Sequence, residues 1–523
     1  MNADANRSSG VRLAELVAAL SLATDLGLGV PQEHVLRQTT IASRLAGLAG
    51  LSQSQRTSVY YTSLLAWVGC VSDSHEMAKW FGDDQRVRAD SYEVDKAGLP
   101  FMSFMVGHVA QGLPPMRRLT MIGRFMAGGF REAGASMMMH CQTAGVLADR
   151  LGLGDEVGAA LAQAFERWDG KGVPGRSAGD AIDPVMRVVQ IADDAEVFTR
   201  LGGIDAAVEM LRARRATEFD PSLVDLVVAH SEEVLGDLDG GAWDETVRAI
   251  GDGDGALGEA ELTEVLTAFA DYADLKSASW TGHSRGVARL AADAARRLGL
   301  PDADRVVVER AALVHDIGAL GVSTGIWDKS SAWTSADRER VRTHPYLTER
   351  VLARPARLAE IGAVASLHHE RLDGSGYPRG VNASGIPVSA RIVAAADVLH
   401  ALGEDRIHRP AFPPKTREVM MREEVRAGRL DGEAVNAVLA AAGHEVRRRP
   451  ELPAGLTARE VEVLTRLVRG ISNKQIAREL GVTPRTVGSH VEHIYAKIGV
   501  STRGAAALFA MSHGLGHPQT SGE

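Results

Sequence analysis

The chain has 523 residues, of which 45% are hydrophobic and 24% charged, and its net charge at pH 7 is −9. This length exceeds what one hydrophobic core serves, so about three or four structural units are expected. The composition is ordinary for a globular protein, and the acidic balance argues against a nucleic-acid or membrane surface that covers the whole chain.

Cysteine usage and apolar runs indicate the compartment. The chain has two cysteines, Cys70 and Cys141, which are too few for a disulfide framework and favour a reducing compartment. The apolar run at residues 13–30 is interrupted by Glu15 and Asp25. It predicts an amphipathic helix rather than a signal peptide, and no run reaches the roughly 18 residues that a membrane span needs. We therefore expect a cytoplasmic protein without membrane association.

Residues 75–130 carry methionine and phenylalanine at helical spacing. The members of this stripe are Met102, Phe104, Met105, Met116, Met121, Phe125 and Met126. Such a stripe favours a helical core or a dimer contact. A sensing pocket is the alternative, and no residue in the stripe identifies a ligand.

The first half of the chain repeats part of the second. Residues 166–174, Glu-Arg-Trp-Asp-Gly-Lys-Gly-Val-Pro, match residues 370–378, Glu-Arg-Leu-Asp-Gly-Ser-Gly-Tyr-Pro, position by position. In both copies another aspartate follows the aspartate of this segment after 24 residues. The repeat predicts that residues 11–235 form a domain of the same type as the second half.

In the second half, polar residues interrupt apolar helical runs. His315 and Asp316 lie in such a run, where unpaired polar side chains are costly. Further residues of this kind stand on separate predicted helices: His283, His344, His368, His369 and Asp397. Imidazoles and carboxylates are ligands for iron, zinc and manganese, so the set can converge on two cations. Asp316 can bridge them, because one carboxylate offers an oxygen to each ion.

The histidine pair is followed by a glycine turn. Gly374 and Gly376 let backbone amides approach an anion closely, as in phosphate-binding loops. Taken alone, the segment favours a histidine pair that caps a buried helix beside a glycine turn. The other polar residues favour the metal site.

The joint pattern resembles the HD-GYP phosphodiesterases, a branch of the HD metal-dependent phosphohydrolases, over residues 277–409. The segments that carry it are His315-Asp316-Ile317-Gly318, His344-Pro345, His368-His369-Glu370-Arg371-Leu372-Asp373-Gly374-Ser375-Gly376-Tyr377-Pro378 and Ala396-Asp397. The resemblance implies two divalent ions (iron, manganese or zinc), one held by His283, His315, Asp316 and Asp397 and one by Asp316, His344, His368 and His369. It also implies a substrate loop with Asp373, Gly376, Tyr377 and Pro378. The implied substrate is a nucleotide phosphodiester, above all cyclic di-GMP.

Several positions depart from this family pattern. Ala319 replaces a lysine that would contact phosphate, Ser323 replaces a proline, Thr348 a glycine and His400 an aspartate. Ser279 stands where an acid would support a third metal. The metal ligands are kept, but one contact with the substrate is lost.

The first copy has lost most ligand positions. The first copy has Ala66-Trp67 at the positions of the histidine-aspartate pair and Ala164-Phe165 at the positions of the histidine pair. Of the seven ligand positions, His34, His140 and Asp193 keep a residue that can bind metal. Three scattered ligands cannot hold a binuclear centre. This copy is expected to be a metal-free scaffold.

The C-terminal segment has clear helix boundaries. Thr457, Ser472 and Thr483 are predicted N-caps, and glycines end the three helices that follow. Residues 444–523 carry 11 basic against 7 acidic residues, which favours a local DNA contact. A short helix, a tight turn and a helix with a polar face predict a helix-turn-helix.

Residues 453–515 resemble the LuxR-type DNA-binding domain. The resemblance rests on Leu456-Thr457-Ala458-Arg459-Glu460-Val461-Glu462-Val463-Leu464, Ser472-Asn473-Lys474-Gln475-Ile476-Ala477 and Thr486-Val487-Gly488-Ser489-His490-Val491. It implies phosphate contacts from Lys474, Arg485, Thr486, His490 and Lys497, and base contacts from positions 488, 489 and 492, which are Gly488, Ser489 and Glu492. Such domains usually bind inverted half-sites as dimers, so a homodimer is expected.

We thus expect an all-α protein with two tandem HD-type helical domains and a four-helix LuxR-type domain. The expected segments are 1–250, a degenerate HD-type domain with a helical insert at about 75–130; 251–276, a linker and entry helix; 277–443, the metal-binding domain; 444–452, a linker; 453–517, the DNA-binding domain; and 518–523, a disordered tail.

The leading hypothesis is a transcription regulator in which a phosphohydrolase domain controls DNA binding. In the alternative, the HD region is catalytically inactive and senses a ligand for the same DNA-binding module, which Ala319 favours. A third hypothesis is a phosphohydrolase whose C-terminal segment only dimerises.

Overall fold

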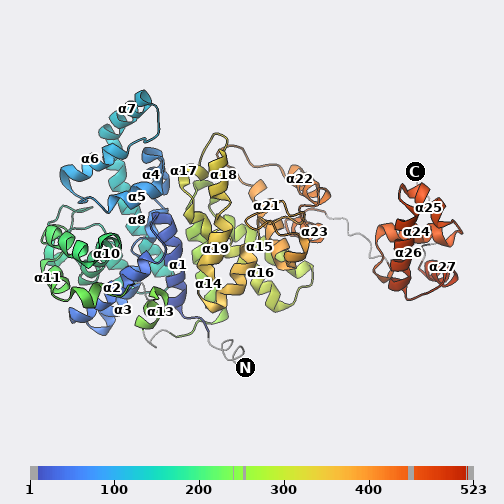
Figure 1. Cartoon of the computed structure of the whole chain (residues 1–523), viewed down its shortest axis with the longest axis horizontal. Coiled ribbons are helices and arrows are strands. Elements are labelled where there is room, and N and C mark those ends of the chain that lie inside the picture. Colours follow the sequence, from blue (N-terminus) through green and yellow to red (C-terminus); the bar gives the residue numbers. More distant parts are fainter. Residues whose placement is uncertain (1–9, 239–240, 251–254, 446–452, 514, 516–523) are drawn as a thin grey trace. The chain divides into compact units, whose positions relative to one another are not determined.

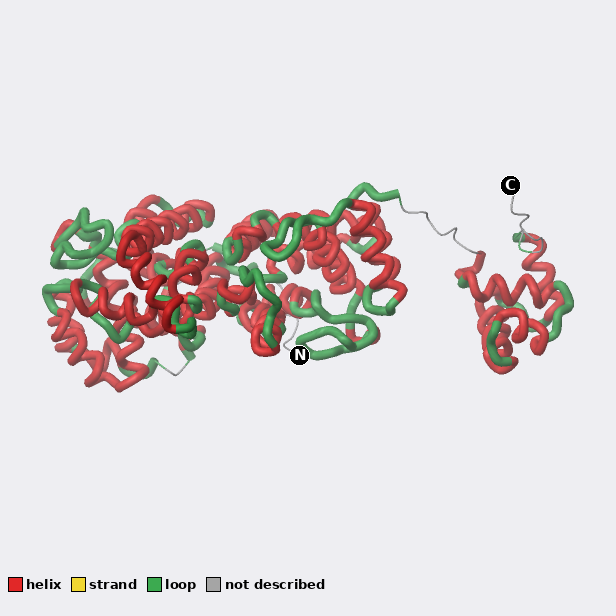
Figure 2. Tube along the Cα trace, turned by 90° about the horizontal axis from the view of Figure 1, so that it is seen from above, coloured by secondary structure: helices red, strands yellow, loops and turns green. Residues whose placement is uncertain are grey.

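The computed structural model describes residues 10–238, 241–250, 255–445, 453–513 and 515. Throughout these ranges the chain forms helices joined by loops, without an extended strand (Figure 2). The expected all-α fold is confirmed. Two compact units are present, Met1–Glu445 and Val446–Glu523. The predicted tail at 518–523 and residues 446–452 of the predicted linker lie outside the described ranges.

The first half of the larger unit contains α1 to α13. Their bounds are α1 (Leu13–Leu28), α2 (His34–Leu48), α3 (Gln53–Leu65), α4 (Ser74–Phe81), α5 (Asp84–Ser91), α6 (Gly98–His108), α7 (Pro115–Arg124), α8 (Phe130–Arg150), α9 (Asp155–Leu161), α10 (Pro184–Arg214), α11 (Pro221–Ala229), α12 (Ser231–Leu235) and α13 (Ala242–Ala249).

The second half contains α14 to α23. Their bounds are α14 (Glu259–Asp274), α15 (His283–Arg297), α16 (Asp302–Val314), α17 (Thr324–Trp327), α18 (Ser335–Val341), α19 (His344–Leu352), α20 (Ala359–Ala365), α21 (Val388–Leu402), α22 (Pro414–Arg426) and α23 (Gly432–Ala441). None of the helices in the described residues is long and apolar enough to cross a membrane.

Helix α1 lies at the border of the two halves (Figure 1). It packs against α2 and α3 on one side and against α19 and the 3-10 helix η7 (Ile317–Gly321) on the other. Most of its side chains are buried, including Asp25, whose carboxylate accepts a hydrogen bond from the Val35 amide at 3.1 Å. The expectation of an amphipathic helix is wrong, because both halves cover α1 and leave no broad solvent face.

The two halves share a packing pattern and a loop. α2 packs against α3 and α10, as α15 packs against α16 and α21. The buried Glu166 carboxylate accepts hydrogen bonds from the backbone amides of residues 175–177, and the buried Glu370 carboxylate accepts them from residues 379–381. The loop structure therefore repeats together with the sequence.

The methionine-rich segment forms helices α4 to α7 and the start of α8, with α6 and α7 at the outer edge of the first half (Figure 1). Met105 and Phe125 are buried in a cluster with Trp80 and Phe81. Met116, by contrast, is 76% exposed. The stripe is thus only partly a core.

Asp84 of α5 joins the two halves. Its carboxylate accepts hydrogen bonds from Lys276 Nζ at 3.1 Å, the Ser323 hydroxyl at 2.6 Å and the Thr324 amide at 3.0 Å. Burial would raise the pKa of Asp84, but Lys276 and Arg88 outweigh it and lower the pKa to about 2. Ser323, which replaces the proline of the HD-GYP pattern, therefore serves the contact between the halves.

The smaller unit is a four-helix module. Its helices are α24 (Ala458–Val468), α25 (Asn473–Leu480), α26 (Pro484–Ile498) and α27 (Arg503–Ser512). Thr457, Ser472 and Thr483 cap the first three through their side chains, as predicted. Gly481 and Gly499 end α25 and α26 in the left-handed region, with φ of 66° and 68°. Val463, Ile476, Val487 and Ile494 contribute to its core.

We predict that Asp84→Ala destabilises the larger unit by roughly 3–5 kcal/mol, because it leaves Lys276 as a buried charge without its partner. Urea unfolding of the whole chain, followed by circular dichroism, measures this loss. Asp225→Ala is the control, since it breaks an exposed ion pair with Arg215 and should barely move the midpoint. Equal midpoints for the two variants would contradict the role of Asp84.

Candidate metal centre

Five helices of the second half bring the predicted ligands together. His283 is the first residue of α15, His344 is the first residue of α19, and Asp397 lies inside α21. His315 and Asp316 follow α16 at the turn into η7, and His368 and His369 follow α20. The Thr348 hydroxyl donates to the His315 carbonyl at 2.8 Å and accepts from the Gly318 amide at 3.0 Å, so it fixes this turn against α19.

Asp316 lies between two pairs of histidines. Its Oδ1 is 3.3 Å from His344 Nε2 and 3.4 Å from His368 Nε2. Its Oδ2 is 3.4 Å from His315 Nε2 and 3.9 Å from His283 Nε2. Each carboxylate oxygen therefore faces a different pair, which is the arrangement that a bridging ligand needs.

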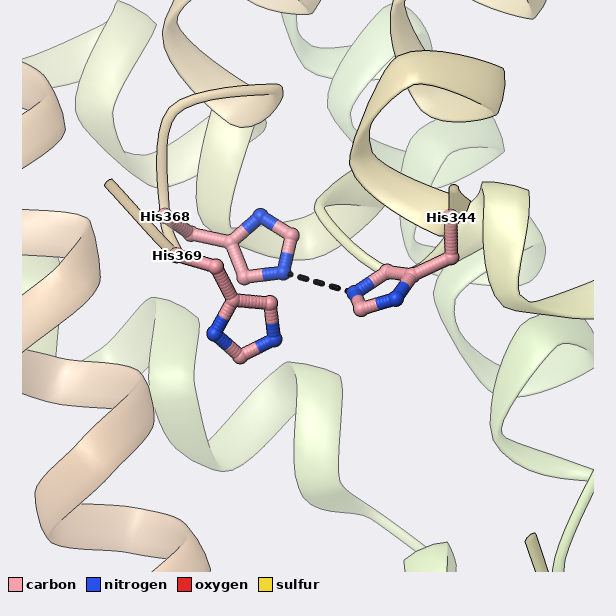
Figure 3. Close-up of side chains that lie close together, drawn as sticks. All are labelled: His344, His368 and His369. Carbon is pink, nitrogen blue, oxygen red and sulfur yellow. Dashed lines mark hydrogen bonds between the residues drawn. The ribbon is translucent and has the colours of Figure 1, made fainter. Parts of the chain in front are cut away.

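Two triads of potential ligand atoms lie on either side of Asp316. His344, His368 and His369 form one, and their rings converge in Figure 3. His283, His315 and Asp397 form the other. Within each triad the candidate atoms lie within 4.8 Å of one another. The structure thus brings all seven predicted metal ligands to one place.

Backbone carbonyls orient three of the histidines. His315, His344 and His368 donate from Nδ1 to the carbonyl three residues earlier, at 2.8, 2.6 and 2.7 Å. A carbonyl only accepts, so each Nδ1 carries the proton and each Nε2 is available as a ligand. The Nε2 atom of His315 is buried and lacks a hydrogen-bond partner in the described structure. An unsatisfied imidazole nitrogen that faces carboxylates fits a metal ion.

His283 is oriented by a carboxylate that sequence reasoning missed. Its Nδ1 lies 3.1 Å from Glu404, which also contacts His400 at 3.1 Å and Arg406 at 2.6 Å. Such outer carboxylates hold metal-binding histidines in position. The spacing of Asp397, His400 and Glu404, three and then four residues, is the signal that could have identified Glu404, which lies just past the end of α21.

Ion pairs within the cluster of metal ligands offset the free-energy cost of burying its charged side chains. Burial would lower the pKa of His283, but hydrogen bonds with Asp397 and Glu404 raise it to about 10. Burial would raise the pKa of Asp316, but His315 and further imidazoles hold it well below its usual value. An imidazole binds metal only when neutral, so His283 gives up a proton when it serves as a ligand.

The substrate loop is only partly directed at the centre. The Tyr377 ring lies 4.7 Å from the ring of His369, and the Arg342 guanidinium lies 5.6 Å from Tyr377. A side chain at Gly376 would collide with the backbone of residues 370–371. Asp373, however, is exposed and bonds the Ser375 amide at 3.0 Å, so it shapes its own turn rather than the cavity.

A cavity of about 280 Å³ opens onto the metal ligands. Tyr377 lines it, whereas Asp373, Gly376 and Pro378 do not. Its walls also include residues that sequence reasoning missed: Trp280, Trp327, Trp333, Arg406 and Arg409. Aromatic rings stack on bases and guanidinium groups bind phosphates. The buried Ala319 offers no charge. Arg409, whose guanidinium bonds backbone carbonyls, supplies positive charge from another side, whereas the charge of Arg406 is paired with Glu404.

The predicted DNA contacts lie mostly on the surface of the smaller unit. Val487 and Ile494 of α26 point into its core. The predicted contacts lie outside this core: Lys474, Arg485, Thr486, Ser489 and Glu492 are exposed and His490 is half-buried. Lys497 differs, because its Nζ bonds Glu460 at 2.8 Å and the Gly455 carbonyl at 3.1 Å. In this structure Lys497 is held within the module.

Comparisons with known proteins agree with this architecture. A family model described as HD domain matches residues 267–434, and one described as bacterial regulatory proteins, luxR family, matches residues 454–510. A 3'3'-cGAMP-specific phosphodiesterase 3 of Vibrio cholerae is 30% identical over 418 residues, which cover 79% of this chain and 91% of that protein.

Two further proteins extend the likeness. A cyclic di-GMP phosphodiesterase of Thermotoga maritima is 34% identical over 183 residues, which cover 34% of this chain and 48% of that protein. A crystal structure of a cyclic GMP-AMP-specific phosphodiesterase of V. cholerae matches with a TM-score of 0.57 and 26% identity, and the match covers 84% of this chain and 99% of that chain.

These matches define a protein with an HD domain followed by a domain of the luxR family of bacterial regulatory proteins. The chain belongs to the HD-GYP family of HD-domain phosphodiesterases, with a LuxR-type domain after the HD domain. Both resemblances seen in the sequence are confirmed.

We predict about two iron, manganese or zinc ions per chain in protein purified without chelator or metal-affinity resin. Plasma mass spectrometry measures them. His315→Ala combined with Asp316→Ala should lose both ions, because Asp316 faces both triads. His230→Ala, at a half-exposed histidine of the first half, should retain them. A wild-type protein that stays empty after anaerobic metal loading would contradict the metal centre.

Proposed function

We propose that this protein hydrolyses a cyclic dinucleotide or related nucleotide phosphodiester at a binuclear centre, and that this site controls DNA binding by the LuxR-type domain. The observation that carries the proposal is the position of Asp316, with one oxygen toward each pair of histidines. The names of the V. cholerae and T. maritima relatives support the substrate class.

The ligands fall into two sets in the proposal. His283, His315 and Asp397 would hold one ion and His344, His368 and His369 the other, and Asp316 would offer one oxygen to each. Two divalent cations supply the charge that stabilises a phosphodiester transition state and activate a water for attack. Iron, manganese and zinc all suit this mixture of imidazole and carboxylate ligands.

Protein side chains position the substrate. Arg406 and Arg409 lie on the cavity wall where they can bind phosphate oxygens, and Trp327 and Trp333 offer faces for bases. The Tyr377 ring packs beside His369 and closes the wall on the loop side. Together these groups hold a phosphodiester over the ligands.

The remaining parts of the chain have supporting roles in the proposal. Residues 1–250 form an HD-type copy without metal, because both ring nitrogens of His34 bond carboxylates, at 2.5 Å to Glu196 and 3.1 Å to Asp193. The smaller unit binds inverted half-sites as part of a homodimer, and the protein acts as a cytoplasmic transcription regulator.

A second candidate function is ligand sensing without turnover. The buried Ala319 favours it, because the lysine that the family pattern places there is missing. In that case the centre binds metal and nucleotide, and DNA binding responds to occupancy alone.

We predict that the manganese- or iron-loaded protein hydrolyses bis(p-nitrophenyl) phosphate and a cyclic dinucleotide. His344→Gln should reduce kcat at least about 100-fold, because it removes a ligand. His140→Gln is the matched control, since the repeat places His140 at the equivalent position and its Nε2 donates to the Ala66 carbonyl. Metal and nucleotide binding without any hydrolysis would favour the sensing function.

We predict that the full-length protein binds a labelled DNA duplex of random sequence with a salt-dependent affinity. Arg485→Ala removes an exposed cation at the start of α26, so it should weaken binding and reduce the salt slope by about 1. Fluorescence anisotropy over a range of salt concentrations measures both effects. An unchanged slope would exclude a phosphate contact from Arg485, and binding without salt dependence would contradict the DNA-binding proposal.

A further inference from the structure

The first half contains a cavity of about 390 Å³ where the second half has its metal ligands. Trp67, Phe165 and Asp193 line it, and the sequence repeat aligns these residues with Asp316, His369 and Asp397 of the metal centre. The volume lies within the roughly 300–1,000 Å³ of small-molecule pockets. The loss of ligands has therefore left a space rather than a closed core.

One wall of this cavity is apolar and comes from the methionine-rich segment. Phe101, Met102, Phe104 and Met105 of α6 line it together with Phe130 of α8. The rings of Phe101 and Phe104 are nearly parallel, with centroids 6.2 Å apart and planes at 10°. Aromatic faces suit a flat apolar molecule, and methionine adapts to its outline.

The charged residues around the cavity disfavour an anionic ligand. Four basic and five acidic residues line it, so the wall carries no excess of positive charge. Cations of the wall already have partners: the buried Arg88 bonds Asp73, and Nζ of the half-buried Lys96 lies 3.3 Å from Asp194. A cyclic dinucleotide with two phosphates would have to break these pairs. A neutral molecule leaves them intact.

We propose that this cavity is a binding site for a small, uncharged, largely apolar aromatic molecule, distinct from the phosphodiester site. The insert that builds its apolar wall has no counterpart in the second half, where 29 residues separate His315 from His344 against 74 between Ala66 and His140. The site is therefore a feature of the first half alone.

Helix α5 connects this cavity to the metal centre. Val87 and Arg88 line the cavity, and Asp84, one turn earlier, bonds Ser323 and Lys276 of the second half. Gln85 donates to the Leu320 carbonyl at 3.0 Å, in the 3-10 helix that follows Asp316. A ligand that moves α5 thus acts on the turn that carries two metal ligands. This regulatory consequence rests on the proposed function, whereas the binding site does not.

The binding test uses N-phenyl-1-naphthylamine, a neutral dye whose fluorescence rises in apolar surroundings, and the full-length protein in chelator. Ala133→Trp fills the cavity from α8 and should raise the dye's Kd at least tenfold. Phe104→Ala removes a ring from the wall and should also weaken binding. Leu119→Ser removes a 63% exposed apolar side chain outside the cavity and should leave Kd unchanged.

Three results would overturn the site. These are an unchanged Kd in both cavity variants with wild-type unfolding midpoints, loss of binding in Leu119→Ser, or competitive displacement of the dye by cyclic di-GMP. Chelator removes the metal ions, so the dye-binding result does not depend on whether the protein is a phosphodiesterase. In a metal-loaded assay, saturating dye should change the hydrolysis rate severalfold in the wild type but not in Ala133→Trp. An equal change of the hydrolysis rate in the wild type and in Ala133→Trp would contradict the coupling between the cavity and the metal centre, but not the binding site itself.

Discussion

The second half of the larger unit depends on one buried carboxylate surrounded by imidazoles. Asp316 faces His344 and His368 with one oxygen and His283 and His315 with the other. A buried carboxylate is costly unless neighbouring groups compensate its charge. Protonated imidazoles, or metal ions that the imidazoles would share with Asp316, compensate this charge. Backbone carbonyls hold Nδ1 of His315, His344 and His368 and leave their Nε2 atoms directed at the centre. Helices α15, α16, α19, α20 and α21 therefore meet where this carboxylate requires partners.

The first half shows what a related helix arrangement becomes without these ligands. His34 bonds carboxylates through both ring nitrogens, and despite burial these contacts raise its pKa to about 10. His140 donates from Nε2 to a carbonyl, so it is not directed at a metal. Ala66, Trp67, Ala164 and Phe165 replace the other ligands, and the two aromatic rings line a cavity that has one apolar wall. The second half thus has a cluster of charged metal ligands, and the first half has a cavity that suits a neutral molecule. Asp84 links the two halves.

Short-range sequence patterns predict much of this structure, because helix caps and ligand motifs lie within a few residues of one another. The caps of the smaller unit and the convergence of the metal ligands follow from such patterns. Contacts between distant segments do not. Glu404 reaches His283 only because α21 packs against α15, and Lys497 meets Glu460 across the module. The burial of α1 and the outward position of Asp373 likewise depend on how segments pack in three dimensions.

The central claim is that Asp316 bridges two metal ions. Anomalous X-ray diffraction from crystals of the manganese-loaded protein, collected at the manganese absorption edge, tests it most directly. The account predicts two peaks on opposite sides of the Asp316 carboxylate, one beside His344 and His368 and one beside His283 and His315. A single peak, or peaks that lie away from Asp316, would contradict it.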